Sequence, residues 1–233
     1  MYNYYGGKLK YYIFLLLFIL SFESFGQDLP PINLKYATQI FSEDNELIAY
    51  LGETKRVQVF ALKELSKDLI DCLIATEDRD FYSHNGVSIK SLGRAALATI
   101  TGKKQGGSTL TMQLCKNLFL TPEKTLERKF NEIKLAMDVE KKFSKDEILL
   151  LYFNTVYWGR NVYGVWAASK EYFNKSPNEL TLSESALLIG LLKGPTYYDP
   201  VKKAQKALER RNEVLHNLVE VNKLTQKRYD LLK

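Results

Sequence analysis

The chain has 233 residues, 45% of them hydrophobic, which suits one globular domain and excludes a disordered or collagen-like chain. Its two cysteines and two histidines lie at scattered positions, which excludes a disulfide scaffold and a tetrahedral zinc site of the usual spacing. The net charge of +6 fits nucleic acid, an anionic membrane surface or a phosphate-bearing substrate equally well.

Residues 1–27 differ from everything that follows. Lys8 and Lys10 precede an unbroken apolar run from Tyr11 to Leu20. The run is shorter than the roughly 20 residues that a membrane span needs, and it has the length of a signal-peptide core. We therefore expect a cleaved signal peptide or a short uncleaved anchor. In both cases the bulk of the chain is exported to the extracytoplasmic side of the membrane, with Lys8 and Lys10 left on the cytoplasmic side.

Residues 28–60 are predicted to form a β-hairpin lead-in. Segments 39–41 and 47–51 are typical of short strands, and the cluster between them is rich in turn residues. The next part, 61–200, is predicted to be the main helical domain, and 201–233 to form charged C-terminal helices. The sequence thus predicts a mainly α fold with a small β appendage.

Apolar spacing and helix caps indicate the individual helices. Leu62, Leu65, Leu69 and Leu73 predict a helix that ends at Glu77. Capping boxes at 144–147, 176–179 and 181–184 each predict a helix that follows. The helix after the first box is predicted over 148–158, with a stop at residue 159. The helix after the third box is predicted to run to residue 194. A charged amphipathic helix is predicted from residue 204 to 218.

The first candidate functional segment lies at the end of the helix predicted over 62–77. Glu77 and Asp78 stand where the helix dipole is negative, so a carboxylate there is electrostatically costly and inclined to take up a proton, as a general base does. The structural alternative is a solvated loop in which Asp78 or Asp80 pairs with Arg79. The local sequence leaves both interpretations open.

The second segment, residues 105–117, places a glycine pair and hydroxyl groups at a helix start, where free backbone N–H groups bind anions. It is not a Walker A loop, because no Gly-Lys-Ser/Thr is present. A plain N-cap by Ser108 accounts for the same residues. Cys115 is expected to pack in the core rather than to react.

The third segment, residues 124–140, is a predicted helix with an apolar face and a charged stripe of Lys124, Arg128 and Glu132 on roughly the opposite side. Such a stripe is typical of a solvated face, where an Arg128–Glu132 pair contributes only about 0.3–0.5 kcal/mol. Alternatively, Lys124, Arg128 and Lys129 clamp a phosphate, with Glu132 acting on its charge or holding a divalent cation. The small residues of a fourth segment, 152–175, are expected to allow close helix packing.

Taken in order, these segments resemble the peptidoglycan glycosyltransferase family, that is, the monofunctional enzymes and the glycosyltransferase domain of bifunctional penicillin-binding proteins. The resemblance covers about residues 38–230 and rests on five motifs: Glu77, Asp78, Phe81, His84 and Gly86; Gly107, Ser108, Thr109, Gln113, Lys116 and Asn117; Arg128, Lys129 and Glu132; Tyr152, Asn154, Gly159 and Gly164; and Glu184, Ala186, Pro195, Tyr198 and Pro200. Five motifs in order at compatible spacing are far more specific than any one of them.

The resemblance implies a lysozyme-like, two-lobed helical fold and the polymerisation of lipid II into glycan strands, with inversion and release of undecaprenyl pyrophosphate. It makes Glu77 the general base and places Glu132 near the donor pyrophosphate. It further implies that the substrate is bound by Asp78, Ser108, Gln113, Lys116, Asn117, Lys124, Arg128 and Lys129. Preorganised cations are most effective where the leaving group gains charge. A Mg²⁺ or Mn²⁺ ion at Glu132 is expected to assist, and no organic cofactor is expected.

Other functions are weighed on the same residues. The chain lacks Ser-x-x-Lys and Lys-Thr/Ser-Gly, so we expect no transpeptidase activity from it, and cross-linking penicillin-binding proteins are expected partners. A lysozyme-type hydrolase also uses two carboxylates, but it has no pyrophosphate for the cationic stripe to bind. A non-catalytic cell-wall scaffold would not need both glutamates. Nucleic acid is not an expected partner of an exported chain whose basic residues are dispersed among acids.

Overall fold

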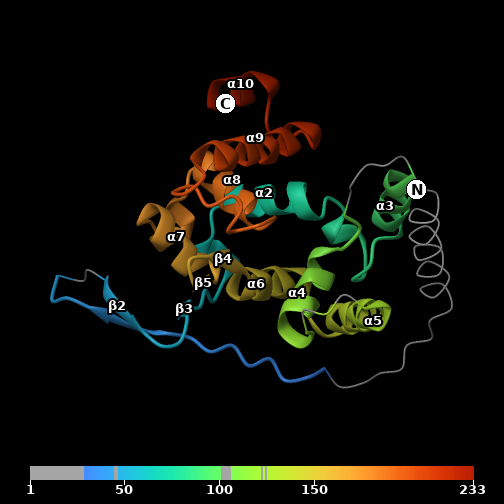
Figure 1. The fold of residues 1–233 in the computed structure, drawn as a ribbon, viewed down its shortest axis with the longest axis horizontal. Helices are drawn as coiled ribbons and strands as arrows, with labels where there is room; N and C mark the ends of the chain where they lie inside the picture. Colours follow the sequence, from blue (N-terminus) through green and yellow to red (C-terminus); the bar gives the residue numbers. More distant parts are fainter. Residues whose placement is uncertain (1–28, 45–46, 101–105, 122, 124) are drawn as a thin grey trace. The chain divides into compact units, whose positions relative to one another are not determined.

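The computed structural model describes residues 29–44, 47–100, 106–121, 123 and 125–233 (Figure 1). The chain divides into a first unit, Met1–Pro31 with Asp80–Ile148, and a second unit, Ile32–Arg79 with Leu149–Lys233. The predicted signal peptide or anchor lies outside the described residues. Within the described ranges, no helix is both long enough and apolar enough to cross a membrane.

The second unit begins with the predicted hairpin. Strands β1 (Thr38–Phe41) and β2 (Leu47–Leu51) pair antiparallel, with Thr38 opposite Leu51, which confirms the prediction. A second small sheet has the order β3-β5-β4, formed by β3 (Lys55–Arg56), β4 (Tyr157–Gly159) and β5 (Val162–Tyr163). Because β3 pairs parallel with β5, it joins two parts of the chain that are far apart in sequence.

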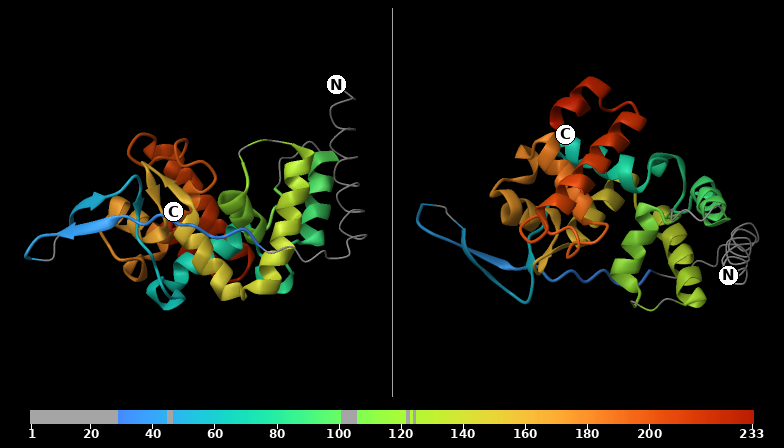
Figure 2. Two further views of the ribbon diagram at one scale, coloured as in Figure 1. Left: turned by 90° about the horizontal axis from the view of Figure 1, so that it is seen from below. Right: turned by 45° about the horizontal axis from the view of Figure 1, so that its top comes forward.

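Helices form the rest of the second unit: α2 (Lys67–Glu77), α7 (Val165–Phe173), α8 (Leu182–Leu191), α9 (Ala204–Glu220) and α10 (Gln226–Leu232), with the short helices η1 (Leu62–Glu64) and η3 (Pro177–Glu179). The central helix is α8, which is mostly buried and packs against both α2 and α9. The last two helices, α9 and α10, contact each other at the red end of the chain in Figure 2. The mainly α prediction is confirmed.

The first unit contains η2 (Phe81–Ser83), α3 (Ile89–Ile100), α4 (Leu110–Phe119) and α5 (Leu126–Lys142), and it ends within α6 (Lys145–Thr155). Helices α4 and α5 pack against each other. Their buried faces contribute Leu114 and Ile133 to the core. This pair of helices carries most of the predicted substrate-binding residues.

Several predicted helix boundaries are wrong; the helix after the 181–184 capping box, for example, ends at Leu191 instead of residue 194. Leu62 and Leu65 lie outside α2, because Ser66 caps that helix by accepting a hydrogen bond from the Leu69 N–H at 3.1 Å. The helix that follows the 144–147 capping box ends at Thr155 instead of residue 158, because the next residues form strand β4. The capping box itself is confirmed: Glu147 accepts the Ser144 backbone N–H at 2.8 Å.

Two residues of the fourth segment have structural contacts within the second unit. Asn154 accepts from the Val59 N–H and donates to the Val59 carbonyl oxygen, both at 2.8 Å, so its amide is used in holding the backbone. Gly159 has φ +93°, and an added Cβ would lie 3.0 Å from the Tyr172 hydroxyl oxygen. The turn therefore requires glycine for its conformation and for the space it leaves.

Candidate functional site

A polar hollow of about 420 Å³ lies in the first unit beside α4 and α5. It is lined by Ser108, Gln113, Lys116, Thr121, Glu123, Arg128, Lys129 and Glu132. Six of these eight residues were predicted from the sequence as site residues. Ser108 precedes the N-cap of α4, two further residues lie on α4, and three lie in the first two turns of α5.

The helix start beside the hollow is capped by Thr109, so the N-cap interpretation of Ser108 is wrong. The Thr109 hydroxyl oxygen accepts the Met112 N–H at 3.1 Å, and the hydroxyl donates to the Gly86 carbonyl oxygen at 2.6 Å. Because Thr109 satisfies the helix end, the Ser108 hydroxyl is available to the hollow, where it accepts a hydrogen bond from Lys129 Nζ at 2.8 Å.

On the other side of the hollow, α5 begins at its N-cap Thr125 and presents three charged groups within its first two turns. Arg128 donates to Glu132 Oε2 at 2.6 Å, and Lys129 donates to Glu132 Oε1. The Glu132 side chain is only 3% exposed, against 17% for Arg128 and 14% for Lys129. The solvated-face interpretation of Arg128 and Glu132 is therefore wrong, because these charges are held in a largely buried cluster.

Burial has an electrostatic consequence for Lys129. It lowers the pKa of the ammonium group, although the neighbouring Glu132 carboxylate acts in the opposite direction. A buried cation whose charge is only partly balanced by its neighbours is stabilised when an anion binds beside it. Arg128 points to the same conclusion, since its Nε atom is buried and has no hydrogen-bond partner within the described part of the chain.

The lining of the hollow favours a multiply charged anion. Lys116, Arg128 and Lys129 supply three positive charges against the two carboxylates of Glu123 and Glu132. Hydroxyl and amide groups of Ser108, Thr121 and Gln113 add neutral hydrogen-bond donors. Cations and neutral donors that converge on one hollow match the oxygen atoms of a phosphate or a diphosphate.

Sequence reasoning missed Thr121 and Glu123, which lie in the stretch between α4 and α5. The signal that could have found them is their position between two helices that both carry cationic site residues. Asn117 lies on α4 as an exposed residue and is not among the lining residues of the hollow. Lys124 lies outside the described residues.

Glu77 and Asp78 lie at the end of α2, which confirms the predicted position. Both belong to the second unit. No basic residue occupies the last turn of α2, so the negative end of the helix dipole is not compensated there. Asp78 is 5% exposed, and its N–H donates to the Ile74 carbonyl oxygen at 3.1 Å. Burial raises the pKa of Tyr152 well above its usual value, and the charge of Glu77 raises it further, which places Glu77 near this buried phenol.

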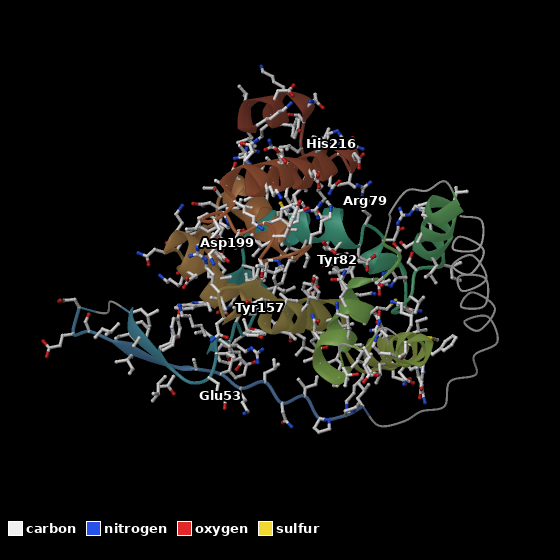
Figure 3. All side chains as sticks on the ribbon, viewed as in Figure 1. Glu53, Arg79, Tyr82, Tyr157, Asp199 and His216 are labelled. Carbon is white, nitrogen blue, oxygen red and sulfur yellow. The ribbon has the colours of Figure 1, made fainter. Side chains whose placement is uncertain are left out.

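The interpretation in which Arg79 neutralises Asp78 or Asp80 is wrong. Arg79 instead binds α9, where it donates to Asn217 Oδ1 at 3.2 Å and to Glu220 (Figure 3). Its Nε donates to the Ala75 carbonyl oxygen at 3.0 Å. The guanidinium group is thus committed to structure within the second unit.

The residues at Glu132 do not fit a divalent cation held by the protein. Both Glu132 oxygens accept hydrogen bonds from cationic side chains, which a metal ion would have to displace. In addition, the described ranges contain no group of three His, Cys, Asp or Glu side chains that could hold a metal ion.

Cys115 packs in the core as predicted, because it is fully buried on α4. Burial raises the pKa of its thiol strongly, and the charges of Glu132 and Glu140 act in the same direction. A thiol in this environment stays protonated and is a poor nucleophile.

Residues 44–219 match the family model described as transglycosylase. The chain is 43% identical to penicillin-binding protein 1A of Escherichia coli over 204 residues, which cover 87% of the chain and 24% of the relative. It is also 43% identical to penicillin-binding protein 2a of Streptococcus pneumoniae over 187 residues, 80% of the chain and 25% of the relative. The chain therefore spans about a quarter of the length of these relatives.

Among solved structures, the crystal structure of penicillin-binding protein 1A from Haemophilus influenzae matches 86% of this chain and 20% of its own chain, with 29% sequence identity and a TM-score of 0.49.

Proposed function

Since this chain belongs to the transglycosylase family, we propose that it is a peptidoglycan glycosyltransferase that polymerises lipid II, an undecaprenyl-pyrophosphate-linked disaccharide-peptide, into glycan strands. The observation that carries the proposal is the cationic hollow of the first unit, which has the charge and the donor groups that a pyrophosphate leaving group needs. A hydrolase of uncharged glycan would have no use for these cations.

In the proposed reaction, Glu77 takes the proton from the 4-hydroxyl group of the acceptor sugar. The acceptor oxygen then forms a bond to the donor anomeric carbon, from the side opposite the leaving group, so the configuration at that carbon inverts. The bond from this carbon to the pyrophosphate oxygen breaks, and undecaprenyl pyrophosphate leaves with the electron pair. Negative charge therefore grows on the pyrophosphate as the reaction proceeds.

Lys116, Arg128 and Lys129 are proposed to stabilise that growing charge, together with the hydroxyl group of Ser108 and the amide of Gln113. These groups are held in place before the reaction, so they need little reorganisation, and such preorganised donors lower the barrier most effectively. The proposal extends to Asp78, Asn117 and Lys124 as substrate-binding residues, on the strength of the sequence motifs alone.

Glu132 is proposed to act next to the donor pyrophosphate by holding two cations in place. Its two carboxylate oxygens accept from Arg128 and Lys129, and its near-complete burial limits the movement of the cluster. Without this carboxylate, the repulsion between the two neighbouring cations would not be compensated.

The proposed place of action is the extracytoplasmic face of the cell membrane, where a substrate linked to undecaprenyl pyrophosphate is available. The growing glycan strand is the second substrate. Cross-linking of the product is assigned to partner enzymes of the penicillin-binding class.

The test is to incubate the purified protein with lipid II that carries a label on the disaccharide, and to separate the products by length. Long labelled strands support the proposal. Shortening of added pre-formed glycan would point to a lysozyme-type hydrolase, and unchanged substrates would point to a non-catalytic scaffold.

Two matched variants on helix α2 test the role of Glu77 as the general base. Glu77→Gln should abolish polymerisation in a folded protein, because the amide cannot accept the acceptor proton. Asp68→Asn, the same kind of change in the first turn of α2, should retain polymerisation. An active Glu77→Gln protein would remove Glu77 from its role.

A further inference from the structure

A largely buried ammonium group outside the hollow joins several parts of the first unit. Lys145, the first residue of α6, donates from Nζ to Glu140 Oε1 at 2.7 Å and to the His84 carbonyl oxygen at 2.6 Å. The same nitrogen lies 4.4 Å from the centre of the Phe81 ring. The Lys145 side chain is 19% exposed and that of Glu140 only 4%. This ion pair therefore anchors both the end of α5 and the loop at residues 81–84.

Glu140 extends the anchorage to α4. Its Oε1 atom also accepts a hydrogen bond from Thr111 Oγ1 at 2.5 Å, and Thr111 is fully buried. Thr111 lies two residues before Gln113, and Glu140 lies about two turns after Glu132. The Thr111–Glu140 bond thus connects the two helices that carry the hollow, at a place outside the hollow itself.

A second polar bond connects the same helices inside the hollow, from Lys129 Nζ to Ser108 Oγ at 2.8 Å. Along α5, Lys129 and Glu140 are separated by 11 residues, or about 16 Å of helix. Two bonds this far apart fix how α4 crosses α5 more firmly than one could. When a phosphate oxygen competes with Ser108 for the Lys129 ammonium, the bond inside the hollow weakens. The remote bond then has to maintain the spacing of the helices.

Stability alone is a weak reason for such an ion pair. Taking two charges out of water costs free energy that their attraction and hydrogen bonds only partly return, and apolar replacements are often as stable. Three partners from two segments, the end of α5 and the loop at residues 81–84, gather around one ammonium group, which instead favours a role in fixing geometry.

We propose that Lys145 is a positioning residue: through Glu140 and Thr111, it holds α4 against α5 at the spacing that the hollow needs to bind a diphosphate. This inference rests on the proposed function of the hollow as the pyrophosphate site. Lys145 itself is not among the residues that line the hollow, so it acts through the two helices.

The test measures binding of farnesyl diphosphate to the full chain by titration calorimetry in the presence of a chelator. Lys145→Met should weaken binding about tenfold, the lower end of the roughly 10–100-fold loss seen when a side chain that orients a metal ligand is removed. Thr111→Val breaks the same connection at its other end and should weaken binding in the same direction. Lys145→Arg keeps the positive charge and should restore much of the affinity.

The matched control is Lys55→Met, which removes the ammonium partner of Glu171, 2.9 Å away, in the second unit. It should lower the melting temperature and leave the affinity within twofold of the parent protein. If Lys145→Met and Thr111→Val bind as Lys55→Met does, the positioning role is refuted while the site stands. If the parent protein itself does not bind farnesyl diphosphate, the proposed pyrophosphate site is refuted, and the inference with it.

Discussion

Replacing Lys129 by Met removes one positive charge from the hollow and keeps most of the side chain's volume. In the native protein, the ammonium group donates to Ser108 and to Glu132, and its side chain is 14% exposed. Removal of one preorganised donor to a developing negative charge costs about 2.7–4 kcal/mol of transition-state stabilisation. We therefore expect polymerisation to fall by about 10²–10³-fold.

The cost to folding is expected to be much smaller. Burial lowers the pKa of Lys129, which shows that the charged form is partly disfavoured in the folded state. Glu132 also keeps Arg128 as a partner after the substitution. We expect the free energy of unfolding to fall by about 1–2 kcal/mol, which corresponds to a loss of about 2–8 °C in melting temperature for a chain of this length.

These two magnitudes distinguish a loss of catalysis from a loss of folded protein. A protein with about 5 kcal/mol of stability that loses about 2 kcal/mol still has about 99% of its molecules folded, so unfolding cannot produce a hundredfold loss of turnover. The assay compares initial rates of strand formation from lipid II with thermal unfolding of the same samples. Lys141→Met is the control, because Lys141 lies on the same helix with a side chain 51% exposed, and both measurements should stay near the parent values.

Polymerisation of lipid II at the parent rate by Lys129→Met, together with a fall in its stability, would contradict this role of the ammonium group. The ammonium group would then serve the packing of α5 and not the leaving group.

Three further predictions follow from single contacts. Gly86→Ala should lower the free energy of unfolding by about 3–5 kcal/mol, because φ is +88° and an added Cβ would lie 2.6 Å from the Ala136 carbonyl oxygen. Urea titrations measure this loss, and an unfolding midpoint equal to that of the parent protein would contradict the close approach. Burial alone would raise the pKa of Asp199, but hydrogen bonds from Arg160 and nearby N–H groups outweigh it and hold the pKa low. The Asp199 carboxylate therefore stabilises the folded protein at pH values above the pKa that this group has in the unfolded chain. This stabilisation is lost as the pH falls through the lowered pKa of the folded state. Asp199→Asn should accordingly lower the free energy of unfolding by about 1–3 kcal/mol at pH 7 and leave it unchanged at a pH below both pKa values. Since burial lowers the pKa of Lys129, farnesyl diphosphate affinity should fall with rising pH before ordinary lysines titrate, and Lys129→Arg should move that fall to higher pH; identical pH profiles would contradict the assignment.

The parts of the fold that follow from local chemistry could be predicted from the sequence. The capping box of Ser144 and Glu147 marked the start of α6, and Thr181 with Glu184 marked the start of α8, because a cap needs only residues within one turn. The helix start at Ser66 was missed, because the apolar spacing of Leu62 and Leu65 continues across it.

Strand β4 could not be predicted, because its sheet depends on distant residues. Val162 in β5 pairs with Lys55 in β3 as well as with Gly159 in β4, and no local pattern reveals a partner about 100 residues away. Residue 159 was predicted to stop the helix, but the helix ends at Thr155 and residue 159 is the last residue of β4.

The candidate site, too, could be predicted from the sequence only in part. The sequence placed cations and carboxylates on the right helices, yet spacing could not distinguish a solvated stripe from a buried cluster. Burial of Glu132 depends on what packs around α5, and this is not encoded in the helical period. Ser108 and Thr109 are adjacent hydroxyl residues, and only the structure shows that Thr109 takes the cap and leaves Ser108 to Lys129.

The proposed transfer reaction releases undecaprenyl pyrophosphate from lipid II, so the amount released can be measured for each disaccharide added to a strand. We expect one molecule released per disaccharide in the parent protein and in Asp68→Asn, and no release above background in Glu77→Gln. Strand growth without release of the lipid pyrophosphate, or undiminished release by Glu77→Gln, would contradict the proposed reaction.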